Sequence, residues 1–177
     1  ETAEMPGHYI GKNFDLAGFS VGIVDEQKII NGLAISSGDA IIGIESSGPH
    51  SNGYSLIRKI LSESSAPQNE IAAMIDLVLK PTHLYPKLIN QLLKKIKING
   101  MAHITGGGIT ENIPRILPDG LSLDIFKDSW IFPKVFQWLQ EQGDISNDDM
   151  YRIFNCGVGM TLIVDQSIKE QAIENIK

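Results

Sequence analysis

Apolar residues recur along this chain with two different periods, and the period changes from segment to segment. Spacings of three and four residues predict amphipathic helices, whereas short β-branched runs bounded by turn residues predict strands. The predicted helices cover residues 54–61, 70–79, 84–98, 133–142, 148–153 and 168–176. The predicted strands cover residues 14–24, 29–30, 40–44, 101–104, 121–126 and 158–165. This order predicts one α+β (mixed α/β) domain, in which helices cover a mixed, largely antiparallel sheet.

The unit around which the chain is organised runs from Ile41 to Leu61, as strand, polar loop and helix. Its loop is built from serines, glycines and an asparagine, which offer hydroxyl and amide donors and let a ligand approach the backbone closely. We expect Ser51 or Asn52 to cap the helix that follows, whose free N–H groups favour an anion such as a phosphate. A phosphate-binding loop and an ordinary capped turn both remain open at this point.

A second loop, from Thr105 to Gly108, contains three consecutive glycines and follows another predicted strand. Glycines cost about 1 kcal/mol each relative to alanine inside regular structure, so three together imply a special backbone geometry. Close approach to a phosphate and a tight crossing of two backbone segments are equally good explanations. We expect Thr110, Asn112 and Arg115 to lie on a short helix next to this loop.

Composition restricts the classes of function. The 177 residues are 42% hydrophobic and 20% charged, which is typical of one globular domain with a substantial core. The net charge of −6 argues against non-specific nucleic-acid binding, and no apolar run reaches the length of a membrane span. We therefore expect no nucleic-acid partner and no membrane insertion.

A single cysteine, Cys156, cannot form an internal disulfide, which fits a reducing compartment and predicts a cytoplasmic protein. Its apolar, glycine-rich neighbourhood favours a buried, inert thiol over a nucleophile. The chain begins at Glu1 without an initiator methionine and has no signal-peptide pattern, which suggests a fragment or a processed product.

Five motifs, in order along almost the whole chain, resemble those of the phosphoribosylformylglycinamidine cyclo-ligases, also called aminoimidazole ribonucleotide synthetases. The motifs are E-T-A-E-M-P-G at 1–7, S-S-G-P-H-S-N-G-Y-S-L at 46–56, P-T at 81–82 with Tyr85, T-G-G-G-I-T-E-N-I-P-R at 105–115 and M-Y-R-I-F-N-C-G-V-G-M at 150–160. The resemblance is to the C-terminal domain of these two-domain enzymes. It implies that residues 1–13 are a junction from a missing N-terminal domain, and that residues 14–177 are the C-terminal substrate- and nucleotide-binding domain.

The resemblance also implies a function in de novo purine biosynthesis. These ligases convert formylglycinamidine ribonucleotide to aminoimidazole ribonucleotide with ATP and Mg²⁺. The formyl amide oxygen is phosphorylated, and an internal nitrogen then displaces phosphate to close the ring. In the family the N-terminal domain supplies most metal and ATP contacts and the main homodimer interface, so we expect this chain to be inactive alone. A stand-alone phosphate- or nucleotide-binding regulatory module of the same superfamily is the alternative.

Carried over position by position, the resemblance implies a set of contacts to substrate or nucleotide phosphate. These residues are Ser46, Ser47, Gly48, Ser51, Asn52, Thr105, Gly106, Gly107, Gly108, Asn112, Asn155 and Gly157. His50 is the catalytic candidate, although a histidine that only binds a phosphate or a loop carbonyl fits the same pattern. No metal ligand is expected in this chain, except that Glu1 and Glu4 fall at the domain junction and could approach the metal–nucleotide site of an intact enzyme.

Overall fold

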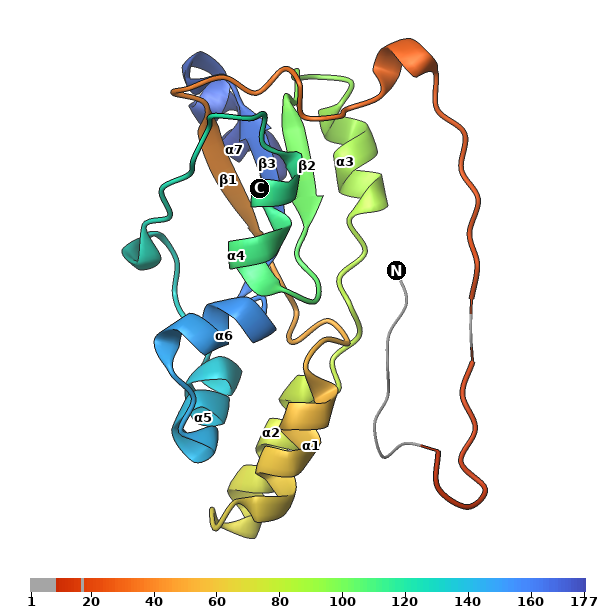
Figure 1. Ribbon diagram of the computed structural model, residues 1–177, viewed down its shortest axis with the longest axis vertical. Helices are drawn as coiled ribbons and strands as arrows, with labels where there is room; N and C mark the ends of the chain where they lie inside the picture. The colour runs from red at the N-terminus through yellow and green to blue at the C-terminus, as the bar shows by residue number, and fades with distance from the viewer. Residues whose placement is uncertain (1–8, 17) are drawn as a thin grey trace.

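Three strands lie at the centre of the computed structural model, which describes residues 9–16 and 18–177 (Figure 1). They are β1 (Ala40–Glu45), β2 (Gly100–His103) and β3 (Val158–Val164), in the spatial order β1-β3-β2. Both outer strands pair antiparallel with β3. β1 and β2 are therefore parallel to each other, and both end at the edge of the sheet where β3 begins.

The central strand β3 is buried along its whole length, which explains its uninterrupted apolar and β-branched sequence. Its pairing with β1 is regular from Ala40 to Ile44, which lies opposite Met160. The register then shifts, because Glu45 lies opposite Val158 and leaves Gly159 without a partner on β1. This β-bulge lies at the end of the sheet where the two outer strands finish, and such bulges often re-aim side chains near functional sites.

Helices surround the sheet on several sides (Figure 1). The α-helices within the described residues are α1 (Tyr54–Glu63), α2 (Gln68–Val78), α3 (Pro86–Leu92), α4 (Gly108–Asn112), α5 (Lys134–Gly143), α6 (Asn147–Ile153) and α7 (Lys169–Ile176). Short 3-10 turns are η1 (Glu26–Lys28), η2 (Pro114–Ile116), η3 (Lys127–Ser129) and η4 (Gln166–Ile168). No helix of the described chain combines the length and apolar character that a membrane crossing requires.

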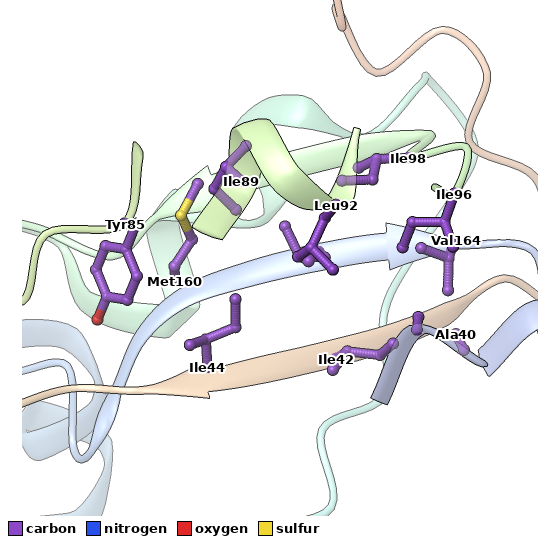
Figure 2. Close-up of a cluster of buried hydrophobic side chains, with 12 residues drawn as sticks. Ala40, Ile42, Ile44, Tyr85, Ile89, Leu92, Ile96, Ile98, Met160 and Val164 are labelled. Carbon is purple, nitrogen blue, oxygen red and sulfur yellow. The ribbon is translucent and has the colours of Figure 1, made fainter. Parts of the chain in front are cut away.

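One hydrophobic core lies between a face of the sheet and helices α3 and α7 (Figure 2). Alternate residues of β1, Ile42 and Ile44 among them, point into this core, where they meet Ile89 and Leu92 of α3. Leu92 is 1% exposed, and full burial of such a side chain contributes about 1.5–3 kcal/mol. The period of two along β1 and the helical spacing along α3 therefore produce a single packed layer.

Two further cores complete the domain. The opposite face of the sheet packs against Ile109 and Ile113, which belong to α4 and the residue after it. The helices α1 and α2 pack on α5, and α6, which lies mainly against α4, joins them around side chains such as Phe136 and Phe154 that are 0% exposed. This helical cluster lies beyond the end of the sheet where β1 and β2 finish (Figure 1). The α+β fold class predicted from the sequence is confirmed.

Three predicted strands are wrong. Residues 29–30 and 121–126 form no strand, and neither do the described residues of 14–24. Phe19 and Val21 are each 97% exposed, and this stretch runs apart from the sheet in Figure 1. β-branched and aromatic residues favour a strand only where another strand supplies hydrogen bonds and a face to pack on. These runs have no such neighbour among the described residues.

The long helix predicted over 84–98 is also shorter than expected, because α3 ends at Leu92. The next residues continue in a tightened turn, with Lys94 N–H bonded to Gln91 O and Lys95 N–H bonded to Leu92 O. Such i to i+3 bonds are common where an α-helix ends. The turn still buries Ile96, so the apolar periodicity extends beyond the helix itself.

Candidate functional site

The three segments predicted to contact phosphate meet at one end of the sheet. Loop 46–53 follows β1, loop 104–107 follows β2, and turn 155–157 precedes β3. Because β1 and β2 are parallel and β3 is antiparallel to both, these connections must lie at the same edge. Hydrogen bonds join them, from Ser46 N–H to Gly157 O and from Ile104 N–H to Gly159 O, each 2.9 Å long.

Asn155 joins turn 155–157 to loop 46–53. Its side chain is 1% exposed, and its Nδ2 donates to Gly48 O over 2.8 Å. Its Oδ1 accepts from Ser46 Oγ and from Gly157 N–H, both at 2.9 Å. Three hydrogen bonds to protein groups occupy this amide, so in this structure Asn155 shapes the loop that a ligand would meet.

Asn112 has the same relationship to loop 104–107. From α4 its Nδ2 donates to Gly106 O over 3.1 Å and to Gly108 O over 2.7 Å, and its Oδ1 accepts from Thr105 Oγ1 over 3.3 Å. The side chain is buried against the loop. The expectation that Asn112 lies on a short helix beside the loop is confirmed, as it is for Thr110, whereas Arg115 lies on η2.

A tight backbone crossing accounts for Gly108. A Cβ on this residue would lie 2.0 Å from the carbonyl oxygen of Tyr151 in α6, and the backbone φ is +59°. No other residue type fits such a contact without displacing α6. The neighbouring Gly106 and Gly107 have backbone N–H groups without a hydrogen-bond acceptor in the described structure, and both are at least partly exposed.

Loop 46–53 places two successive residues, His50 and Ser51, in the left-handed region, with φ of 53° and 62°. The prediction that Ser51 or Asn52 caps α1 is wrong, because Gly53 occupies the cap position and no side chain caps the helix. Asn52 instead donates to His50 O over 2.8 Å. Ser51 is exposed and its hydroxyl has no partner among the described residues.

A cluster of aromatic rings that sequence reasoning missed lies behind loop 46–53. Tyr85 is at its centre, with its ring centroid 6.1 Å from that of His50, 4.9 Å from that of His83 and 5.8 Å from that of His103. We call these four residues the histidine–tyrosine cluster. Their separations in sequence give no sign of the contact, and only the P-T motif with Tyr85 indicated that this segment matters.

The bulge at Gly159 makes room for this cluster. A Cβ at Gly159 would lie 2.0 Å from Tyr85 Oη and 2.7 Å from His50 Cε1. Tyr85 Oη donates to Glu45 O, at the bulge, over 2.8 Å. Burial raises the pKa of Tyr85, helped by the charge of Glu45, so the phenol stays protonated and keeps this bond.

The predicted ligand contacts differ in their access to solvent. Ser46, Ser47, Ser51, Asn52, Thr105, Gly106 and Gly107 are exposed or half-buried, whereas Gly48, His50, Gly108, Asn112, Asn155 and Gly157 are buried. A cavity of about 410 Å³ opens beside Ser46 and Gly157 and is lined mostly by apolar side chains, with Trp130 among them. Ligand binding by these residues stays a prediction.

The described residues contain no group of three or more His, Cys, Asp or Glu side chains arranged to hold a metal ion. Glu1 and Glu4 lie outside the described residues. Cys156 is a free thiol that is 0% exposed, and burial raises its pKa to about 12. The prediction of a buried cysteine is confirmed, and so high a pKa leaves almost no thiolate at neutral pH.

Comparisons with known proteins show the family to which this chain belongs. A family described as AIR synthase related protein, C-terminal domain, matches residues 36–177. A phosphoribosylformylglycinamidine cyclo-ligase from Nitrosococcus oceani is 51% identical over 180 residues, which cover 100% of this chain and 50% of the relative. Another, from Methylobacillus flagellatus, is 52% identical over 93% of this chain and 48% of its own length. The chain spans about half the length of these relatives, and it belongs to the family of AIR synthase related C-terminal domains.

Proposed function

We propose that this chain is the C-terminal half of a phosphoribosylformylglycinamidine cyclo-ligase, and that it binds phosphate groups of formylglycinamidine ribonucleotide or of ATP. The observation that carries the proposal is the meeting of loops 46–53 and 104–107 with turn 155–157 at one end of the sheet. Relatives of about twice the length that bear this enzyme's name support it.

The groups left free at this end of the sheet suit phosphate oxygens. The N–H groups of Gly106 and Gly107 and the hydroxyl of Ser51 have no partner among the described residues. N–H and O–H donors are what phosphate oxygens accept, and neighbouring N–H groups in a loop form anion-binding concavities. The cavity of about 410 Å³, which Ser46 and Gly157 line and Ser51, Gly106 and Gly107 do not, has the volume of a small-ligand site.

The residues described here fit the phosphates of ATP better than they fit Mg²⁺. The chain offers N–H and hydroxyl donors at the site, whereas the described part contains no cluster of side chains arranged for a metal. Bound ATP would activate the formyl amide oxygen of the substrate as a phosphate ester. In this proposal the chain holds and orients phosphate groups, and the ligands to Mg²⁺ come from an N-terminal domain.

The proposal extends to the assembly. The half of each relative that this chain does not cover corresponds to an N-terminal partner domain, which completes the site and forms a homodimer in the cytoplasm. A site formed by only one of the two domains cannot position the attacking nitrogen against the activated oxygen. Such positioning supplies much of the rate enhancement in reactions of this kind. We therefore expect the isolated chain to be inactive.

Turnover assays test this proposal. The full-length protein and this chain are each given formylglycinamidine ribonucleotide, ATP and Mg²⁺, and aminoimidazole ribonucleotide is measured. We expect turnover by the full-length protein and none by this chain. Turnover by this chain would contradict a site that needs both domains. A full-length protein without turnover would contradict the assignment of function.

Two substitutions in the full-length protein test the loops themselves. Gly107→Val adds a branched side chain to the loop that bears the free N–H groups, where its Cβ would lie 2.6 Å from Glu111 Oε2, and Ser51→Asp places a negative charge in loop 46–53. Both are expected to raise KM at least about tenfold. Gly120→Val is the matched control for backbone strain, because Gly120 has a φ of +84° with no atom near its Cβ position. Ser37→Asp controls for charge on an exposed turn before β1. Equal effects in test and control variants would remove these loops from the site.

A further inference from the structure

His50 is buried although it belongs to a surface loop. It is 4% exposed, its backbone φ is 53°, and its imidazole points toward β3, where Nδ1 lies 3.0 Å from the Cβ position of Gly159. Two backbone N–H groups point at its Nε2, that of Ser47 at 2.9 Å and that of His83 at 3.3 Å. One imidazole nitrogen therefore joins loop 46–53 to the segment that precedes α3.

These contacts determine which nitrogen carries the proton. A backbone N–H is an obligatory donor, so a nitrogen that receives two of them must present its lone pair. Ser47 Oγ also lies 2.9 Å from Nε2, but its one proton goes to Pro81 O at 2.6 Å. Neutral imidazole has one donor and one acceptor nitrogen, so the proton is on Nδ1, which is buried and has no partner in the described structure.

We propose that His50 is a positioning residue that stays neutral in the Nδ1–H form, and that its Nε2 lone pair fixes the Ser47 backbone for ligand binding. This inference rests on the proposed function, and it replaces the proton-transfer role that the sequence suggested for this histidine. A second proton on Nε2 would face the N–H groups of Ser47 and His83, and a proton leaving Nδ1 would have no acceptor. Neither step of general acid–base catalysis is open to His50 in this arrangement.

The groups that face His50 from other elements support a neutral imidazole. His103 on β2 and His83 in the segment before α3 bring further imidazole rings, and the Tyr85 hydroxyl is held by Glu45 O. Burial, and then the charges of His103 and His83, lower the pKa of His50 to about 4. Within the described structure, no carboxylate forms a hydrogen bond with the His50 ring that would favour the imidazolium.

Nuclear magnetic resonance tests the tautomer directly in this chain. Histidine labelled with ¹⁵N distinguishes protonated from unprotonated ring nitrogens, and His50 is assigned by its loss in His50→Gln. The expected result is an Nδ1–H tautomer whose ring signals do not move between pH 8 and pH 5.5, whereas histidines of the urea-unfolded chain titrate near 6.5. An Nε2–H tautomer, or a midpoint for His50 within this range, would overturn the proposal.

Two substitutions of His50 by amide residues, His50→Gln and His50→Asn, test the positioning role. The Gln amide oxygen reaches the place of Nε2, and the Asn oxygen reaches only the place of Nδ1, although Asn tolerates a positive φ better. Amide hydrogen exchange at Ser47 is therefore expected to stay slow in His50→Gln and to become at least about tenfold faster in His50→Asn. If backbone strain were the important factor, the order of the two variants would be reversed, and the proposal would be wrong.

The same pair in the full-length protein separates positioning from proton transfer. Loss of an essential acid or base lowers kcat by about 10²–10⁴, equally in both variants, and removes a limb of the pH–rate profile. A positioning residue predicts that His50→Gln keeps more activity than His50→Asn, that KM changes more than kcat, and that the profile keeps its shape. A full-length protein without any turnover would contradict the proposed function, but it would leave the tautomer and the Ser47 exchange measurable.

Discussion

The side-chain amide of Asn155 donates to the carbonyl oxygen of Gly48 over 2.8 Å, although 107 positions separate the two residues. This bond closes the end of the sheet, because Gly48 belongs to the loop after β1 and Asn155 to the turn before β3. Two motifs that are far apart in sequence therefore form one structural unit. The hydrogen bond between them gives both motifs a structural role that does not depend on any ligand.

Asn155→Ala is expected to destabilise the fold strongly. It leaves Gly48 O, Ser46 Oγ and Gly157 N–H without their partner at a site that is 1% exposed. Unpaired buried groups cost about 1–3 kcal/mol each, so we expect a loss of about 3 kcal/mol in urea unfolding. Asn52→Ala is the control, because its side-chain amide makes a single hydrogen bond within the described structure, to His50 O, from a half-buried position. Equal losses in the two variants would contradict the joining role of Asn155.

Gly159→Ala is expected to show that the β-bulge accommodates the histidine–tyrosine cluster. The new methyl group would lie 2.0 Å from Tyr85 Oη, and overpacking of this kind costs about 1–3 kcal/mol. Tyr85→Phe removes the oxygen that clashes, so the double variant is expected to lose less stability than the two single losses predict. Gly43→Ala on β1 is the control, with its methyl 3.2 Å from Val158 Cγ1. Additive losses in the double variant would contradict this account.

The strands that were predicted correctly are those with a partner inside the chain. The runs at 40–44, 101–104 and 158–165 correspond to β1, β2 and β3, which supply hydrogen bonds to one another. The run at 14–24 has equally strong β-branched and aromatic character, yet its described residues are exposed. Side-chain type indicates that a segment can be a strand, whereas the presence of an edge to pair with is a property of the folded chain.

The candidate site was predicted in part for a similar reason. The loop glycines and serines are local signals, and the loops that they mark lie together at one end of the sheet. The second explanation for the glycine loop applies at Gly108, where the backbone of α6 crosses. The contact of Tyr85 with His103 depends on how the segment before α3 meets β2, and no periodicity of the sequence predicts it. Local patterns therefore identified the loops but not the groups packed behind them.

The stability of the chain is expected to fall as the pH is lowered from about 6.5 to about 4. Burial, together with His103 and His83, lowers the pKa of His50 to about 4, whereas an unfolded histidine titrates near 6.5. Between these values the unfolded chain binds more protons than the folded chain, so unfolding becomes easier as the pH falls. The stabilisation is complete above pH 6.5, and up to about 3 kcal/mol of it is lost by pH 4 at 1.36 kcal/mol per pKa unit.

Urea unfolding of the chain and of His50→Gln at pH 7.5, 6.5, 5.5 and 4.5 measures this effect. Carboxylates contribute to the pH dependence of both proteins, so the difference between the two curves isolates the histidine. This difference is expected to be largest at pH 7.5 and to shrink steadily toward pH 4.5. A constant difference over the whole range would mean that the pKa of His50 is not lowered in the folded state.

The Cys156 thiol is expected to resist modification while the chain is folded. It is 0% exposed, it donates to Met150 O over 3.3 Å, and burial raises its pKa to about 12. Because the thiolate is the reactive form, this raised pKa lowers the thiolate population about 10³-fold relative to an unfolded cysteine.

Reaction of Cys156 with a thiol reagent at pH 8 should therefore occur only through unfolding. The rate is expected to increase with urea in parallel with global unfolding, and to become independent of reagent concentration only where labelling is faster than refolding. Fast labelling of the native chain in the absence of urea would show that α6 opens locally and exposes the thiol.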